Sequence, residues 1–222
     1  MDRLEWLAER RAVVEATYDA EAATYDESDI PITPTHTQFV NRLLETCPPR
    51  GTVLDAPCGT GRYFPLVEAA GRHVVGADQS AGMLAQAGAR GIAAAVHRIG
   101  LQEMTFEGEF DGVMTVDAME NVPPEDWPVV LANLHRAVRP GGHLYFTVEE
   151  VPDQEIEEAF AEATASGLPA VRGEIVTGDT AGYHYYPGRE RVYGWLADEG
   201  LEVVEEGYNS GNGYGYHHLL VR

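Results

Sequence analysis

Basic residues are scarce in this chain. Lys and Arg together number 15 against 36 Asp and Glu, so the formal net charge is −21. Proteins that bind nucleic acid neutralise its phosphates with clustered cationic side chains, and no basic run is present here. Binding to an anionic membrane surface needs the same clusters. We therefore expect neither nucleic acid nor a membrane as a partner. The acidic excess is typical of a highly soluble protein, and a cationic partner selected by charge is the alternative explanation.

Cysteines and long hydrophobic runs are also few. Cys47 and Cys58 are the two cysteines, and their spacing suits neither a disulfide framework nor a zinc knuckle. No apolar run approaches the ~18 residues that span a membrane. Residues 1–27 carry charges every few positions and lack the apolar core of a secretory signal. These features predict a protein of the reducing cytoplasm.

The spacing of apolar residues predicts alternating helices and strands. Residues 1–27 have helical spacing, Pro31 and Pro34 interrupt the chain, and Thr35 is placed to cap a helix over residues 36–46. Strands are then expected at residues 52–56, 73–78, 92–97, 110–117 and 143–148, and helices at 61–70, 80–89 (capped by Ser80) and 127–138. This order indicates right-handed βαβ units and a parallel sheet with helices on both faces.

The C-terminal third has a different pattern. It predicts an acidic helix over 152–166, a loop over 167–187 and a helix over 189–198. Two strands, 201–208 and 215–222, follow around a glycine-rich link at 209–213 and are expected to form an antiparallel hairpin. The predicted fold is α/β: one Rossmann-like, doubly wound sheet of about seven strands, mostly parallel, with an antiparallel C-terminal hairpin.

The stretch VLDAPCGTGRY at residues 53–63 is the first strand-to-helix turn, where ligands of such sheets bind. Gly59 and Gly61 permit close backbone approach. Asp78 ends the next strand, 23 residues after Asp55, near the ~20-residue spacing of an acid that accepts ribose hydroxyls. A dinucleotide site would need a third glycine, which is missing, and would place a pyrophosphate near Asp55. A cationic, phosphate-free ligand such as S-adenosylmethionine suits that carboxylate.

VLDAPCGTGRY resembles motif I of the class I S-adenosylmethionine-dependent methyltransferases. The likeness continues in order through HVVGADQSAGMLAQA, LQEMTFEGEFDGVMTVDAMENVPPEDW and LHRAVRPGGHLYFTV. TYDAEAATYDE resembles the N-terminal segment that folds over the methyl donor in many small-molecule members. The resemblance covers about residues 18–150, and the expected hairpin at 200–222 fits the family's final strands.

The resemblance implies a role for each matching position. Asp55 would face the methionine end of S-adenosylmethionine, and Asp78 would accept the ribose hydroxyls. The other implied donor-binding residues are Ala56, Pro57, Gly59 and Gly61 by their backbone, Gln79, Met83, Leu101 and Gln102 near adenine, Asp117 and Ala118 near methionine, and Tyr18 and Tyr25 from the lid. Gly100 stands where many relatives carry an aspartate. The product would be S-adenosylhomocysteine.

Simpler explanations remain open for three of these features. Gly59 and Gly61 also suit a tight turn without a ligand. Asp78 could cap a helix, although Ser80 offers a cap two residues later. Tyr18 and Tyr25 lie seven residues apart, so they could share one helix face as core aromatics.

The acceptor site is expected in the variable segments, at Glu120 and Asn121 and at AGYHYYP, residues 181–187. Tyr183, Tyr185 and Tyr186 could wall an aromatic pocket around His184, whose imidazole titrates near neutrality and could act as a base. A surface loop packed on the 189–198 helix is the alternative.

A metal site is not expected. His36, His184 and His217 offer no close pair on one face. A magnesium site at Asp117, Glu120 and Asn121 is the remaining metal hypothesis.

No D-P-P-Y or N-P-P-Y motif of amino-directed DNA methylation follows the fourth strand, where DAME stands at 117–120. The sequence therefore predicts methyl transfer to a small organic acceptor, with oxygen favoured over nitrogen or carbon. Donor binding without turnover and a nicotinamide-dependent oxidoreductase are the alternatives. We expect one domain, with a lid at 1–47, a donor-binding core at 48–150, an acceptor cap at 151–200 and a hairpin at 201–222, as a monomer or homodimer.

Overall fold

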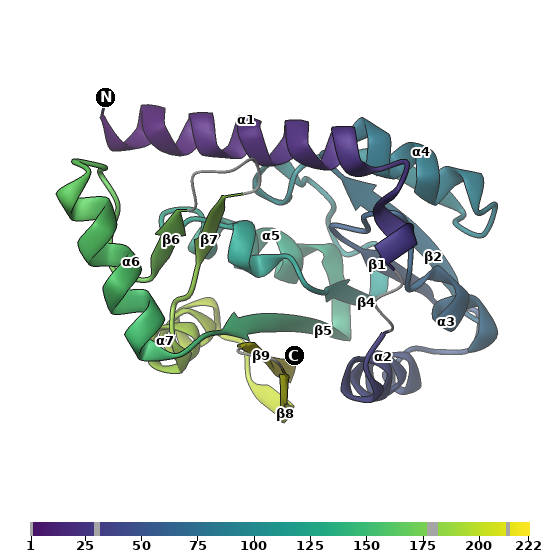
Figure 1. The fold of residues 1–222 in the computed structure, drawn as a ribbon. Coiled ribbons are helices and arrows are strands. Elements are labelled where there is room, and N and C mark those ends of the chain that lie inside the picture. The colour runs from purple at the N-terminus through teal and green to yellow at the C-terminus, as the bar shows by residue number, and fades with distance from the viewer. Residues whose placement is uncertain (1, 29–31, 177–181, 212–213) are drawn as a thin grey trace.

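A seven-stranded sheet organises the chain (Figure 1). The computed structural model describes residues 2–28, 32–176, 182–211 and 214–222; Pro31, part of the expected 167–187 loop and part of the expected 209–213 link lie outside these ranges. The strand order is β3-β2-β1-β4-β5-β9-β8. Its strands are β1 (Thr52–Asp55), β2 (His73–Asp78), β3 (Ala95–Arg98), β4 (Phe110–Thr115), β5 (Val138–Glu150), β8 (Val203–Gly211) and β9 (Tyr214–Val221).

The sheet is mostly parallel. β1 pairs in parallel with β2 and β4, β2 with β3, and β4 with β5. β9 runs antiparallel to both β5 and β8, and so forms the expected C-terminal hairpin. The strand order reverses between β1 and β4, which places a ligand crevice at the carboxyl ends of these two strands. The predicted fold class is confirmed.

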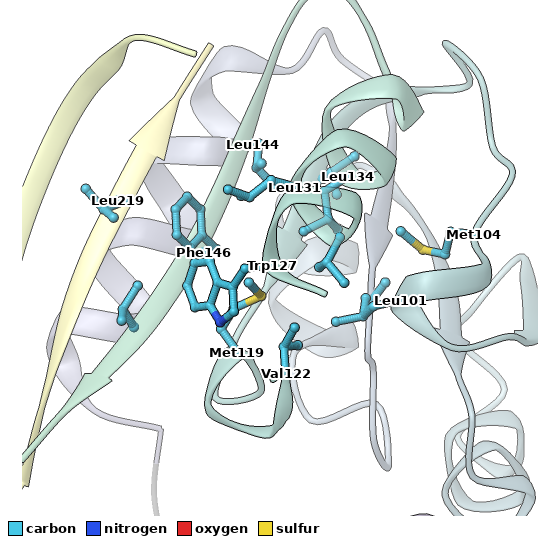
Figure 2. Packing of buried hydrophobic residues seen from close by; sticks show 14 of the residues in the cluster. Leu101, Met104, Met119, Val122, Trp127, Leu131, Leu134, Leu144, Phe146 and Leu219 are labelled. Atoms are coloured by element: carbon cyan, nitrogen blue, oxygen red, sulfur yellow. The ribbon is translucent and has the colours of Figure 1, made fainter. Parts of the chain in front are cut away.

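Helices cover both faces of the sheet. One face packs against α2 (Pro34–Thr46), α3 (Phe64–Ala69) and α4 (Ala81–Ala89), and the other against α5 (Trp127–Ala137) and α7 (Arg189–Glu199). Figure 2 shows Trp127, Phe146 and Met119 packed where α5 meets the sheet. Trp127 also stacks on Trp195 of α7, with ring centroids 4.9 Å apart.

The N-terminal helix α1 (Arg3–Glu21) lies across the molecule, from the β6–β7 region at one end to α4 at the other (Figure 1). Its start is fixed by a capping box, in which the Asp2 side chain accepts from the Glu5 N–H and the Glu5 side chain accepts from the Asp2 N–H. The short 3₁₀ helix η1 (Tyr25–Ser28) follows. The N-terminal segment therefore bridges parts of the chain that are remote in sequence.

Several element boundaries differ from the predicted ones. Thr33, not Thr35, caps α2 and accepts from the His36 N–H, because Pro34 is well suited to the first helical position. α3 begins at Phe64 rather than 61, because the glycine turn continues through Tyr63. β3 begins at Ala95 rather than 92, and β5 begins at Val138, where it pairs with Phe110 before a register shift. Ser80 caps α4 as predicted.

The segment predicted as a loop over 167–187 contains two short strands. β6 (Glu174–Val176) pairs antiparallel with β7 (Tyr183–Tyr185), after helix α6 (Asp153–Ala165). Tyr183 and Tyr185 are buried while His184 between them is half-buried, which is the alternation of a strand. The loop prediction was wrong at these residues, because glycines and charges around them obscured the pattern.

The described residues contain no helix that is both long enough and apolar enough to cross a membrane.

Candidate functional site

Two carboxylates end adjacent strands at the crevice. Asp55 closes β1 and is 1% exposed, and its Oδ2 atom has no hydrogen-bond partner. Burial, with a smaller effect of the Asp78 charge, raises the pKa of Asp55 well above its usual value. A buried carboxyl group without a partner is costly, so this position favours a ligand that carries positive charge.

Asp78, at the end of β2, closes the glycine turn. Its Oδ2 accepts from the Gly59 N–H at 2.8 Å, and its Oδ1 accepts from the Ser80 N–H at 2.9 Å. Burial raises the pKa of Asp78, and these backbone hydrogen bonds oppose the shift. Asp78 is thus a fixed acceptor at the carboxyl end of β2, and Ser80, not Asp78, caps the following helix.

The turn itself requires glycine. Gly59 and Gly61 have φ of 51° and 78°, in the left-handed region that side chains disfavour. A Cβ at Gly61 would lie 2.7 Å from the Phe64 ring. The close approach of turn and ring leaves no room for a side chain at this position.

The strand ends open onto a cavity that gathers most of the predicted donor-binding residues. Those that line it are Tyr18, Tyr25, Pro57, Gly59, Asp78, Gln79, Met83, Leu101, Gln102, Asp117 and Ala118, together with Asn121 from the predicted acceptor set. Asp55, Ala56 and Gly61 are buried but are not part of this lining. Gly100, noted above for its missing aspartate, also lines the cavity, and sequence reasoning missed the further lining residues Arg11, Val14, Cys58, Thr60, Arg62, Tyr63, Ile99, Val116 and Val122.

The N-terminal segment supplies one wall of this cavity. The Tyr18 and Tyr25 rings meet edge to face, with centroids 6.0 Å apart, and the Tyr18 side chain hydrogen-bonds with Asn121. Asp19 accepts from the Ser80 Oγ at 2.5 Å and from the Gly82 N–H at 2.8 Å, which ties the end of α1 to the start of α4. The two tyrosines do not share a helix face, because Tyr25 lies beyond α1, in η1.

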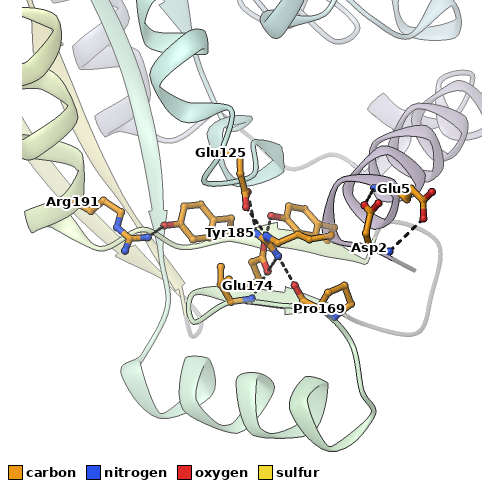
Figure 3. A network of polar contacts seen from close by, with 10 residues as sticks. Asp2, Glu5, Glu125, Pro169, Glu174, Tyr185 and Arg191 are labelled. Carbon is orange, nitrogen blue, oxygen red and sulfur yellow. Dashed lines mark hydrogen bonds and ion pairs between the residues drawn. The ribbon is translucent and has the colours of Figure 1, made fainter.

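The other end of α1 is tied to the C-terminal third. Arg3 pairs with Glu174, which is fully buried, at 2.8 Å, and with Glu125 at 2.5 Å (Figure 3). Glu174 also accepts from the Tyr183 hydroxyl at 2.6 Å. Helix α1 is therefore held at both ends, by contacts that no local sequence pattern reveals.

Gly100 lies at the predicted adenine end of the cavity. A Cβ at this residue would lie 2.6 Å from Oε2 of Glu103 and 2.8 Å from Nη2 of Arg11. Arg11 and Glu103 form an ion pair, and their side chains fill the space that an aspartate side chain would need here. Where the resemblance implies an aspartate at residue 100, this chain has an ion pair between the N-terminal helix and the loop after β3.

Asp117 follows β4 at the opposite end of the cavity, with φ of 52°. Its N–H donates to the Thr147 hydroxyl at 2.8 Å, which stabilises this uncommon backbone conformation. His36 Nε2 lies 2.8 Å from Asp117 Oδ1, and His36 Nδ1 lies 2.6 Å from the Thr33 hydroxyl. Sequence reasoning missed the His36–Asp117 pair, because 81 residues separate the two.

Two further carboxylates lie near Asp117. Glu120 is 7% exposed, and its Oε2 has no hydrogen-bond partner. Burial, followed by the charge of Glu149, raises its pKa well above the usual value. Burial, with the charges of Asp117 and Glu155, raises the pKa of Glu149 to about 7. Glu149, at the end of β5, was not predicted, since it adjoins no recognisable motif.

The predicted aromatic pocket is divided. Tyr183 and Tyr185 pack into the core, and their hydroxyls meet Glu174 and Arg191 rather than the cavity (Figure 3). His184 Nδ1 lies 3.1 Å from the Tyr186 hydroxyl, and burial lowers the pKa of His184. Among Tyr183, His184, Tyr185 and Tyr186, it is Tyr186 that is close enough to Glu149 and Glu120 to be affected by their charges. Burial is the main cause that raises the pKa of Tyr186, and these two charges add to the shift.

The described residues include no group of three or more His, Cys, Asp or Glu placed to hold a metal ion. The three histidines considered as ligands are instead separate. His36 pairs with Asp117, His217 lies 3.0 Å from Glu206, and His184 contacts Tyr186.

Known proteins resemble this chain in sequence and in fold. Residues 53–142 match a family model described as a methyltransferase domain. A demethylmenaquinone methyltransferase of Clavibacter sepedonicus is 25% identical over 215 residues, which cover 90% of this chain and 86% of that protein. The sequence match therefore extends well beyond the glycine turn.

Two solved structures share the fold. One is a 1,6-didemethyltoxoflavin-N1-methyltransferase from Burkholderia thailandensis, with a TM-score of 0.72 and 17% identity over 97% of this chain and 89% of that one. The other is a magnesium protoporphyrin IX methyltransferase from Synechocystis PCC 6803, with a TM-score of 0.66 and 16% identity over 96% and 98% of the two chains. Residues 53–142 therefore match a methyltransferase domain, and the chain as a whole has the fold of these two methyltransferases.

Proposed function

We propose that this protein transfers the methyl group of S-adenosylmethionine to a small organic acceptor, bound between the glycine turn and the N-terminal segment. The observation that carries the proposal is the pair of carboxylates at the ends of β1 and β2. Asp55 is buried without a hydrogen-bond partner for its Oδ2, and Asp78 lines the cavity. S-Adenosylmethionine offers a cationic ammonium group for the first and ribose hydroxyls for the second.

Each donor-binding residue has a proposed task. Asp78 already accepts two N–H groups, but a carboxylate has about four acceptor positions, so it retains capacity for ribose hydroxyls. Asp117 borders the methionine moiety opposite Asp55. The remaining contacts are assigned to the backbone of Ala56, Pro57, Gly59, Gly61 and Ala118, to Gln79, Met83, Leu101 and Gln102 around adenine, and to Tyr18 and Tyr25 over the donor.

The bound donor supplies a methyl group activated by a sulfonium. The protein's contribution is alignment and exclusion of water, and effective molarity from alignment can lower a barrier by roughly 7–11 kcal/mol at best. Tyr18 and Tyr25 close one side of the cavity, and the contacts of Asp19 with α4 hold them there. We propose the division of the chain that the sequence predicts: a lid, a donor-binding core, an acceptor cap and a C-terminal hairpin.

We propose oxygen as the acceptor atom, as the sequence favours, with N- or C-methylation and donor binding without turnover as alternatives. A hydroxyl acceptor must lose its proton, which a base with a pKa near neutrality does best. Glu149, whose pKa burial raises to about 7, fits that role better than His184. His184 reaches the acceptor end only through Tyr186. Asn121 and Glu120 are proposed to contact the acceptor.

Titration calorimetry with S-adenosylmethionine and S-adenosylhomocysteine tests the donor site. We expect micromolar binding to the wild type and binding about tenfold to a hundredfold weaker in Asp78→Ala, because hydrogen bonds to a charged group are lost. Asp198→Ala, at an exposed position on α7, should bind as the wild type does. Asp78→Asn and a melting curve separate lost contacts from a disordered turn. If neither ligand binds the folded wild type, the proposed function is wrong.

A further inference from the structure

Glu120 is the most unusual buried group outside the donor end. It lies in η3 (Met119–Asn121), beside the cavity residues Ala118 and Asn121. Its exposed fraction is 7%, and its Oε2 has no hydrogen-bond partner. Leaving such an atom unpaired is costly, and a ligand group bound at this place would complete its contacts.

The charged neighbours of Glu120 are also acidic. Glu149 and Asp117 both add to the shift that raises its pKa, and Asp117 and Glu155 act likewise on Glu149. Within the described ranges, no arginine forms an ion pair with Glu120, Glu149 or Asp117. Asp117 has His36 as a partner, whereas Glu120 and Glu149 have no such partner within the described ranges, and a cation bound beside them would favour their ionised forms. Like charges at close range repel, and a cation between them would reverse this cost.

Tyrosines lie near the same carboxyl group: Tyr18 hydrogen-bonds with the neighbouring Asn121 and meets Tyr25 edge to face, and Tyr216 is paired with Glu149 across β5 and β9. Burial is the main cause that raises the pKa of Tyr18, Tyr25, Tyr186 and Tyr216, and the charge of Glu120 adds to the shift at all four. These hydroxyls therefore lie within the field of Glu120. Aromatic faces combined with a carboxylate are the surroundings in which proteins bind ammonium groups.

The methyl donor does not account for these groups. In the proposed function, Asp55 faces its ammonium group and Asp78 its ribose, which leaves Glu120 and Glu149 without a donor group to bind. Arg62, the cavity's arginine near the tyrosines, influences Tyr25 and Tyr63, whereas Glu120 is influenced by carboxylates. An anionic acceptor would thus meet repulsion at the Glu120 end.

We infer that the acceptor is a cationic amine, whose ammonium group binds beside Glu120 and Glu149 and against the faces of the surrounding tyrosines. The inference rests on the proposed function, because it assumes that the donor occupies the Asp55 and Asp78 end. It adds the charge and chemical class of the substrate. A molecule with both an ammonium group and a hydroxyl group satisfies this inference and the proposed oxygen acceptor together.

The test uses two probes of the same shape and different charge. Choline carries a quaternary ammonium group, and 3,3-dimethylbutan-1-ol is its neutral carbon isostere. Each is titrated into protein saturated with S-adenosylhomocysteine, for the wild type, Glu120→Gln, Glu149→Gln and Glu162→Gln. The last is a matched control on the exposed face of α6. Benzoate serves as an anionic probe in the same series.

We expect choline to bind the wild type about tenfold or more tightly than its isostere. The ratio of choline affinity to isostere affinity should fall toward one in Glu120→Gln and decrease in Glu149→Gln. It should be unchanged in Glu162→Gln. S-Adenosylhomocysteine affinity should stay the same in all four proteins, which shows that the variants are folded and the donor end is intact.

Three results would overturn the inference: equal binding of the two probes, a preference that survives both glutamine variants, or tighter binding of benzoate than of choline. The first would indicate that Glu120 is a neutral carboxylic acid that donates to an uncharged acceptor. These outcomes leave the proposed function standing, because S-adenosylhomocysteine binding is measured separately. Failure of S-adenosylhomocysteine to bind would instead overturn the proposed function.

Discussion

Carboxylates are buried in different ways at the donor end of the cavity and at the acceptor end, where Glu120 lies beside the lining residues Ala118 and Asn121 but is not part of the lining. At the donor end, Asp78 accepts two backbone N–H groups, and its position follows from the turn that it closes. At the acceptor end, Glu120 has an oxygen without a partner, and its neighbours are other acids. A carboxylate whose oxygens accept hydrogen bonds from the protein is fixed in place, whereas one with an unpaired oxygen can still accept a hydrogen bond from a ligand. The difference suggests that the donor end is preformed and that the acceptor end is completed on binding.

The largest expected effect concerns the rigid end. Gly61→Ala should lower the free energy of unfolding by about 3 kcal/mol, because it combines a positive φ with a clash against Phe64. Gly71→Ala is the control, since Gly71 has a similar φ of 72° and a Cβ added there would meet no atom within 4 Å. It should cost about 1 kcal/mol. Urea unfolding measures both, and equal losses would contradict the role of the Phe64 contact.

A smaller effect is expected at the acceptor end, and it depends on pH. Folded Glu149 keeps its proton up to about pH 7, whereas unfolded Glu loses it near its ordinary value of about 4.3. Between these values the folded state binds more protons, so stability falls as pH rises through this window. Asp117 and Glu155 are the charged groups that contribute to this shift, after burial.

Glu149→Gln removes this penalty. Its gain in stability over the wild type should grow from about pH 4.5 to about pH 7 and then level off, at on the order of 1 kcal/mol after allowance for solvent screening of a half-buried group. Thermal unfolding at about pH 5 and about pH 8 checks the sign. A variant that is less stable than the wild type at the higher pH would show that Glu149 has a cationic partner, and would break the contrast between the two ends.

The smallest effect concerns the link between the N-terminal helix and the donor end. Asp19→Ala removes the acceptor of the Ser80 hydroxyl and the Gly82 N–H, so Tyr18 is less firmly held over the cavity. Donor affinity should fall by about threefold, since exposed hydrogen bonds contribute little. Calorimetry with S-adenosylhomocysteine measures it, with Asp198→Ala as the control. Unchanged affinity would mean that the contacts of Asp19 with Ser80 and Gly82 do not contribute to donor binding.

The same contrast explains what could be predicted from sequence. The donor end is built from a strand, a turn and the next strand, so its residues appear in order, and the bond from Gly59 to Asp78 spans only 19 residues. The alternation of strands and helices along the chain indicated the mostly parallel, doubly wound sheet for the same reason. Local patterns determine local geometry, and here they were sufficient.

Most contacts at the acceptor end and in the C-terminal third could not be predicted from the sequence, because they join residues that are far apart along the chain. His36 meets Asp117 from 81 residues away, and Arg3 meets Glu174 from 171 residues away. Such pairs depend on tertiary packing and have no spacing that identifies them. Tyr183 and Tyr185 were misassigned to a pocket because aromatic residues near a histidine suit a ligand site and a core strand equally well. Their alternation about His184 was the available signal for β7.

Helix α1 is fixed at one end by Arg3 and Glu174 and at the other by Asp19 with Ser80 and Gly82. Because contacts hold both of its ends, this helix cannot rotate freely about either one. Exchange of S-adenosylhomocysteine for a fresh donor would then require one of these two sets of contacts to open, and the pair of Arg3 with the fully buried Glu174 is the harder to break. The end of the helix that carries Tyr18 would then loosen before the end that carries Arg3.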